Sequence, residues 1–392
     1  MSEKGWLGKL FLIEDQQRGA RKRPFFMSKN NVSLIVNGVS YYGWLGISIT
    51  TKLESITREF SVSTTTKASK RNDYSFEFDI GDFVEVKIGN DLVLTGFVTN
   101  IVEKLSNGNH EITVSGKSKT IDLVECCIPD KKPQCYKKVK VLSIIRDLAA
   151  HYDVELVEDV VKTDEIDFDV SPEEKIKEAL DRLIKKYNLL LTDNPKGQLV
   201  VSLPGAKGDC KDRLTVGVNV LSSQRSRVSS PLFCRYVVLG QGTNPLSERP
   251  LEDNQLMCIV EDSSVRFRVC TRVLSGNATQ AEVQSRATSL KNVSKAESNK
   301  LTYTVQGWRQ SDDTLWTTNS LVMVDDDVFG IRSQFVISAA EYVLDKNGMS
   351  TTLTLTPLAK YVTTELPSTE AVVRSRALSS IGSVTESWWT KK

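Results

Sequence analysis

The sequence lacks any stretch that could cross a membrane as a helix. It contains no run of about 18 apolar residues without charge, the length that a spanning helix needs. The apolar segment from Trp6 to Ile13 is short, includes a lysine, and is followed by Glu14-Asp15 instead of a small-residue cleavage site. We therefore expect no secretory signal, no membrane-spanning segment, and a chain of cytoplasmic origin.

Cysteine and histidine are too few, and wrongly spaced, for the sites they usually build. The seven cysteines are an odd number, include the adjacent pair Cys126-Cys127, and have no CxxC spacing. They indicate no disulfide framework, so we expect reduced and buried thiols. The two histidines, His110 and His151, lie outside any nucleophile motif. A triad of Cys127, His151 and an aspartate would need a convergence in space that the sequence does not support.

The chain also lacks an excess of charge of one sign. It has 51 lysines and arginines against 49 acidic residues, a formal net charge of +2, which selects neither nucleic acid nor an acidic surface as partner. Arg225, Arg227 and Arg235 form a modest basic run, which we interpret as a solvated face, with nucleic-acid contact as the alternative. A phosphate-binding loop is not indicated, because Gly240-Gln241-Gly242 lacks the third glycine and precedes Pro245.

The motif that looks most catalytic is the acidic triplet Asp325-Asp326-Asp327. Adjacent carboxylates can hold a divalent cation or divide the acid and base roles of a hydrolase. Consecutive side chains of a strand point to opposite faces, however, so these three carboxylates converge only in a special turn. We interpret the triplet as a polar turn between strands. The sequence therefore predicts no catalytic residue, no metal ligand and no cofactor-binding residue.

What the sequence does contain is a compact β pattern between Leu301 and Pro357. Apolar and polar residues alternate in four short runs, and Asp345-Lys346-Asn347-Gly348 has the composition of a hairpin turn. An earlier stretch has the same order of strands and turns. When Val84 is aligned with Val322, Phe97 aligns with Phe335 without a gap. A gap of two residues then aligns Asn107-Gly108 with Asn347-Gly348. We interpret this echo as a duplicated β domain, of which a symmetric trimer would present six.

A chain of 392 residues is too long for one core and predicts three or four domains. Between the two β patterns, Leu142 to Tyr152 and Ile176 to Tyr187 have helical spacing, and Ser171, Pro172 and Glu174 have the pattern of a capping box. Asn277 can cap a further helix over 278–295. The predicted order is a basic arm (1–29), a first β-barrel domain (30–128), an α+β domain (129–205), a second β-barrel domain (206–245 and 298–357), an inserted small αβ domain (246–297) and a tail (358–392).

The fold class predicted from these patterns is mixed but mainly β. Two quasi-equivalent antiparallel β-barrel domains, tube-like in form, are accompanied by two small α+β domains. The tail is polar and ends in Trp388-Trp389, which we interpret as an anchor to another protein, with packing on the chain's own surface as the alternative.

Three segments together resemble one known family. The LTYTVQGWRQ and FVISAAEYVLDKNGMSTTLTLTP segments are similar to the C-terminal barrel of the baseplate hub proteins of Mu-like contractile-tailed bacteriophages. The GDFVEVKIGNDLVLTGFVTNIVEKL segment, with HEITVSGKSKTIDLVECC after it, resembles the first barrel of that family. The SPEEKIKEALDRLIKKYNLLLTDNPKGQLVV segment resembles its intervening α+β domain. The resemblance covers residues 30 to 360 and leaves the arm and the tail unmatched.

The resemblance implies a structural role without catalysis. Such hub proteins are homotrimers in the virion, assembled in the host cytoplasm, whose two tube-like domains per subunit make a pseudo-sixfold ring. The ring joins the hexameric tail tube to the trimeric central spike, contacts other baseplate proteins, and lets DNA pass through its lumen without sequence-specific binding. The alternatives are a tail-associated enzyme that degrades cell-wall glycan and the hub part of a type VI secretion-like spike, although a long C-terminal β-prism repeat is missing.

Overall fold

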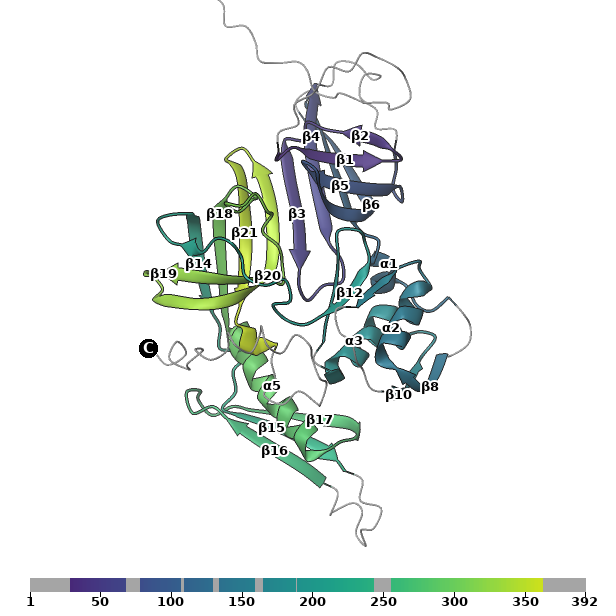
Figure 1. Cartoon of the computed structure of the whole chain (residues 1–392), viewed down its shortest axis with the longest axis vertical. Helices are drawn as coiled ribbons and strands as arrows, with labels where there is room; N and C mark the ends of the chain where they lie inside the picture. The colour runs from purple at the N-terminus through teal and green to yellow at the C-terminus, as the bar shows by residue number, and fades with distance from the viewer. Residues whose placement is uncertain are drawn as a thin grey trace, which may run out of the picture.

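The computed structural model describes residues 29–67, 78–106, 109–129, 134–158, 165–187, 189–242 and 255–361. The basic arm up to residue 28, the Asn107-Gly108 turn and the tail from residue 362, with Trp388 and Trp389, lie outside these residues. The fold is mainly β with few helices (Figure 1). Two β units lie side by side at one end of the molecule, with the helices and the smaller sheets toward the other end.

The first β unit follows the alternating pattern of the sequence. Val36-Asn37-Gly38-Val39 forms its first hairpin, and both turn residues have positive φ, as a two-residue hairpin turn requires. The strands of this unit are β1 (Val32–Val36), β2 (Val39–Tyr41), β3 (Gly46–Lys52), β4 (Glu59–Lys67), β5 (Phe83–Ile88), β6 (Asp91–Ser106) and β7 (Asn109–Ser118).

The second β unit is assembled from two separate parts of the chain. Its hairpin turns between Asp345 and Gly348, as the sequence predicted. Its strands are β13 (Leu214–Thr215), β14 (Val220–Arg227), β18 (Asn299–Gln306), β19 (Leu321–Asp326), β20 (Ile331–Asp345) and β21 (Gly348–Thr356), followed by the short helix η1 (Leu358–Lys360).

One 13-stranded sheet runs through both β units. Its main path is β14-β18-β21-β20-β3-β4-β7-β6-β5-β1-β2, with β19 and β13 attached beside β20. The two units meet where β20 pairs with β3. The two predicted barrels are not confirmed, because no sheet formed by the described residues closes on itself. A single hydrophobic core also extends across both units and includes Val62 of the first and Tyr303 of the second.

The duplicated strand pattern is visible in the pairing of the strands. The order β3-β4-β7-β6-β5 in the first unit matches β14-β18-β21-β20-β19 in the second. The hairpins β6–β7 and β20–β21 agree residue for residue at an offset of 239, from Ser106 to Asp345, and carry bulges at the equivalent residues Thr99 and Ser338. Phe97 therefore corresponds to Val336, one residue from the predicted match, because β5 and β19 are joined to the next strand by turns of different length.

The helical domain between the two β units has its own core. It comprises α1 (Ile121–Glu125), β8 (Gln134–Lys140), α2 (Val141–Ala150), β9 (Leu156–Glu158), β10 (Glu165–Val170), α3 (Ile176–Tyr187), β11 (Leu190–Asp193) and β12 (Leu199–Ser202). The predicted hairpin of β11 and β12 is confirmed. The predicted helix start at Ser171 is wrong: α3 begins at Ile176, whose N–H donates to the Cys126 carbonyl, and the Glu174 carboxylate pairs with Arg182 instead.

A small sheet with one helix completes the fold. It consists of β15 (Arg235–Gln241), β16 (Gln255–Glu261), β17 (Val269–Asn277) and α5 (Gln280–Ser298). Strand β15, which the sequence analysis assigned to the second barrel, pairs here with β16 and β17, because Val238 packs against Val283 and Ala287 of α5. Thr279, and not Asn277, caps α5.

The seven cysteines all lie in the described residues and are free. Cys135 is exposed and the other six are half-buried, so the prediction of buried thiols is wrong.

Candidate functional site

The joint between the two β units is formed by backbone pairing of β20 with β3, and side-chain hydrogen bonds add to it. Residues 339–344 of β20 pair antiparallel with residues 47–52 of β3. Ser48 Oγ donates a hydrogen bond of 2.7 Å to Glu341 Oε1 across the joint. Behind it, the Tyr342 hydroxyl donates to the Trp316 carbonyl, and Trp308 Nε1 donates to the Val343 carbonyl at 3.1 Å. The Tyr342 and Trp308 bonds lie within the second unit and hold β20 in place, whereas the Ser48–Glu341 bond depends on the pairing of the two units.

Arg309 fastens the loop after β18 to the first β unit. Its Nη2 atom donates to the carbonyls of Lys29 (3.0 Å) and Ile88 (3.2 Å), and lies 2.7 Å from Asp91 Oδ2. Its Nη1 atom donates to the Asp313 carbonyl at 2.7 Å. The guanidinium therefore bridges both units with charge-assisted bonds, which are stronger than neutral ones.

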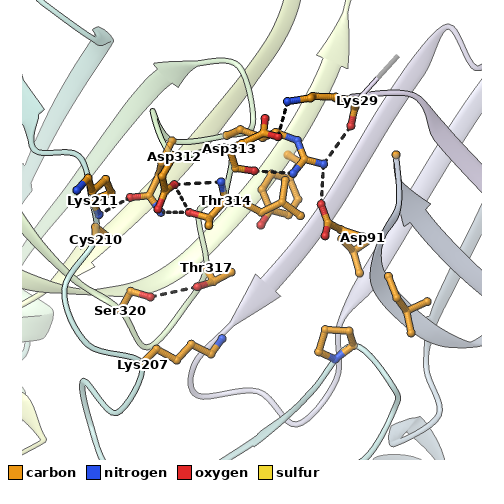
Figure 2. Close-up of a pocket in the computed structure, with 18 of the residues that line it drawn as sticks. Lys29, Asp91, Lys207, Cys210, Lys211, Asp312, Asp313, Thr314, Thr317 and Ser320 are labelled. Carbon is orange, nitrogen blue, oxygen red and sulfur yellow. Dashed lines mark hydrogen bonds and ion pairs between the residues drawn. The ribbon is translucent and has the colours of Figure 1, made fainter. Parts of the chain in front are cut away.

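A cavity of about 1230 Å³ opens beside the joint. Figure 2 shows its lining: the Asp312–Thr314 loop lies at one rim, and Lys207 extends into the space from the opposite side. Charges of both signs line the cavity, including Asp91 and Asp209 as well as Lys207 and Lys211. This mixture does not select an anionic or a cationic ligand, so the cavity by itself identifies no substrate.

A buried ion pair fixes the first β unit to the helical domain next to this cavity. Arg58 Nε lies 2.9 Å from Asp193 Oδ1, and its other nitrogens donate to the Val93 and Asp193 carbonyls. Burial raises the pKa of the Asp193 carboxyl, and the Arg58 charge opposes that rise. Burial, followed by the positive charge of Arg58, lowers the pKa of Lys207 to about 8. Arg58 and Asp193 therefore hold the first β unit and the helical domain together.

The acidic triplet does not converge. Asp326 is fully buried and accepts hydrogen bonds from the Tyr303 hydroxyl and the Phe329 N–H, both at 2.9 Å. Asp325 and Asp327 are solvent-accessible, and both pair with Arg332 at 3.1 and 2.7 Å. One carboxylate is therefore structural, and the other two are neutralised by an arginine at the surface.

The histidines and cysteines considered in the sequence are also separate. His110 Nε2 lies 3.6 Å from Glu103, whereas His151 Nε2 lies 2.7 Å from the side-chain amide of Gln134. Cys127 Sγ donates to the Glu173 carbonyl. Within the described part of the chain, no group of three or more histidine, cysteine or acidic side chains could hold a metal ion.

The basic run and Gly240 belong to strands. Arg225 donates to Asn299 across β14 and β18, and Arg235 pairs with Glu261 across β15 and β16. Gly240 lies within β15, close to Val283 of α5. No described helix is long and apolar enough to cross a membrane.

Two strand edges stay open on either side of the joint. Within the residues that the structure describes, β14 pairs with β18 alone, apart from an isolated bridge between Val220 and Val216, and the distal half of β6 pairs with β7 alone. Edges of this kind offer unpaired N–H and C=O groups to another strand. The arrangement is therefore that of an assembly surface, with an internal joint and two free edges.

No sequence motif marks the two arginines that link the parts of the molecule. Arg309, after β18, bridges the two β units, and Arg58, before β4, ties the first β unit to the helical domain. Only the alternation of strand residues, which identified β3 and β20, could have pointed to the site.

Comparisons with known proteins agree on one group. Residues 31–118 match the family model for "Mu phage baseplate assembly protein GpP-like, N-terminal". Residues 120–203 match "Baseplate hub protein gp44-like, second domain", and residues 279–363 match "Mu phage baseplate assembly protein GpP, fourth domain". The baseplate hub protein gp44 of Escherichia phage Mu is 28% identical over 341 residues, which cover 84% of this chain and 88% of that protein.

Two solved structures share the fold. The 43 kDa tail protein of prophage MuSo2 from Shewanella oneidensis has a TM-score of 0.76 at 24% identity, over 85% of this chain and 99% of that one. A tail protein from Neisseria meningitidis MC58 has a TM-score of 0.70 at 23% identity, over 84% and 98% of the two chains.

Proposed function

The chain belongs to the family of baseplate hub proteins of Mu-like phage tails, and from this premise we propose that three copies form a ring that joins the tail tube to the central spike. As a baseplate hub protein it is a component of the virion. The family is structural, which favours a role without catalysis.

The observation that carries the proposal is the repetition of one β unit within a single sheet. Both units have the same strand order, and β20 of one joins β3 of the other edge to edge. A contact that links different surfaces of successive units is heterologous, and such contacts form a ring when the rotation closes. A threefold ring of chains then presents six similar units. The six units match the symmetry of a sixfold tube on one side, and the three chains match that of a threefold spike on the other.

The size of such a ring suits a conduit for DNA. The path from β14 to β6 contains eight strands, so three chains contribute 24. At the usual spacing of about 4.8 Å between strands, they enclose a cylinder at least about 35 Å across, measured between backbones. A DNA duplex fits within it after side chains are allowed for.

The face of the sheet opposite the core suits the lining of that conduit. One row of side chains crosses seven strands and both units without an ionised group: Gln306, Ser350, Val343, Ser48, Ser61, Ser115 and Asn100. Binding of the phosphate backbone depends on lysine and arginine. This row therefore offers no lysine or arginine to a passing duplex.

Co-assembly tests this function. The chain is co-expressed with the tube and spike proteins of its own tail, and the molecular mass of the purified complex is measured. We expect three copies of the 43.7 kDa chain per complex, bound to both partners. A complex with two or six copies, or binding to only one partner, would refute the joining role.

A further inference from the structure

Equivalent halves of two strands differ sharply in exposure. Residues 99–106 of β6 are exposed, except for half-buried Ile101, and Leu105 exposes 72% of its surface. The equivalent residues 338–345 of β20 are buried or half-buried, except for Asp345. The difference arises because β3 pairs with β20 at this position, whereas no described strand pairs with β6 there. The distal half of β6 therefore has the shape of an edge that receives a strand.

The strand equivalent to β3 is itself unpaired on one side from residue 221 onward, as far as the described residues go. In the second unit β14 occupies the place of β3, next to β18 as β3 is next to β4. β14 and the distal half of β6 lie toward opposite ends of the shared sheet, so they do not meet within one chain. Both edges can be filled by the same contact only if β14 comes from a second copy.

We infer that the distal half of β6 pairs antiparallel with β14 of a neighbouring copy, in the register that β20 has with β3. The inference rests on the proposed ring and names the strands that would close it. Two differences in residue number fix this register. Residues of the β20–β21 hairpin are numbered 239 higher than their equivalents in β6–β7, and residues of β14 are numbered 176 higher than their equivalents in β3, so that Ser226 is equivalent to Thr50. It places Val102 opposite Ser226, Glu103 opposite Arg225, and Lys104 opposite Gln224.

Charge complementarity supports this register independently. The offsets were fixed by backbone pairing alone, yet they place an acidic side chain directly opposite a basic one, which is a stabilising cross-strand pair. Among the described residues of one chain, Glu103 has an ion pair with His110 at 3.6 Å, which requires a protonated imidazole. Burial and the nearby charge of Arg227 lower the pKa of Arg225, so an added carboxylate would offset an existing repulsion.

The same register covers an exposed apolar side chain. Leu105, which exposes 72% of its surface, is placed opposite Ser223. Leu221 lies close by, at the β-bulge of β14, and exposes 60% of its surface. Pairing with β14 therefore removes Leu105 from water.

Paired cysteines test the register in the full-length chain. Val102→Cys and Ser226→Cys are combined, and mild oxidation is expected to link the chains covalently up to a trimer. The matched control combines Val102→Cys with Gln224→Cys, which lies on the same strand two residues out of register, and should link at least about tenfold more slowly. The wild-type chain controls for the seven native cysteines.

The mass of the unmodified chain separates the possible failures. If it is trimeric but the in-register pair links no faster than the control, the strand joint is wrong and the ring stands. If no trimer forms alone or with partners, both the joint and the proposed function fail.

Charge reversal gives a second measurement at two positions outside the hydrophobic core, exposed Glu103 and half-buried Arg225. Glu103→Arg and Arg225→Glu should each weaken the trimer about tenfold, because three joints each place like charges opposite one another. The double variant should recover most of the affinity. Unchanged affinity in both single variants would overturn the pairing.

Discussion

At the residue scale, Asp326 explains why the acidic triplet builds no catalytic site. Its carboxylate is fully buried and receives one hydrogen bond from a tyrosine and one from the backbone. Asp325 and Asp327 turn outward to Arg332. Alternation along a strand, which is visible in the sequence, was sufficient to predict this separation. The partner of the buried carboxylate was not predictable, because Tyr303 lies 23 residues away on another strand.

Removal of the tyrosine hydroxyl tests the structural role of Asp326. Tyr303→Phe should lower the free energy of unfolding by about 1–3 kcal/mol, because a buried carboxylate oxygen loses its donor. Asp327→Asn, at an exposed position of the same triplet, should change it by less than about 0.5 kcal/mol. Denaturant unfolding of both variants provides the comparison. Equal effects would show that burial of Asp326 contributes little.

Lys207 predicts a specific dependence of stability on pH. Its pKa is about 8 in the folded chain and 10.5 in the unfolded one, so the unfolded chain binds more protons between these values. Stability from this group therefore rises with pH from about 8 to 10.5, and is lost as pH falls through 8. Thermal unfolding midpoints should rise less over this interval in Lys207→Met than in the wild type. Parallel curves would contradict the low pKa.

At the scale of elements, hairpins were predicted better than helix ends. Asn37-Gly38 and Asp345–Gly348 form the turns that their composition indicates, because positive backbone angles favour few residue types. Helix starts depend on competing caps. The Ser171 box did not begin α3, and Thr279 took the place assigned to Asn277.

The cap of α5 can be tested against a threonine in the same helix. The Thr279 side chain accepts from the Glu282 N–H at 3.2 Å, and Glu282 bonds back to the Thr279 N–H at 2.7 Å. Thr279→Ala should cost about 1 kcal/mol and speed hydrogen exchange in the first turn of α5. Thr288→Ala, within the helix, should be neutral or slightly stabilising, since Thr288 bonds only to the Gln284 carbonyl. Equal costs at both sites would argue against the capping box.

Strand partners were less predictable than strands. The alternating residues of β3 and β20 identified both as strands, yet nothing in their sequences indicates that they pair with each other across 293 residues. Strand β15 shows the same limit, because its pattern fits either sheet and only the packing of Val238 on α5 decides.

At the scale of the whole molecule, the two stretches of similar sequence form two β units that share one sheet. The strand order and the bulges at Thr99 and Ser338 repeat, while the predicted closed barrels are absent from the described residues. A single chain therefore holds two similar units and one joint between them. In the ring that we propose, the other joints need further copies, and the open edges of β6 and β14 are available for them.

The most direct test of this account is the number of copies around the tail axis. Electron cryo-microscopy of assembled tails, reconstructed at the baseplate without imposed symmetry, counts them. The account predicts three copies that place six β units in a continuous ring, with β6 of each chain beside β14 of the next. A single copy, or two or six copies, or a ring in which those strands lie apart, would contradict it.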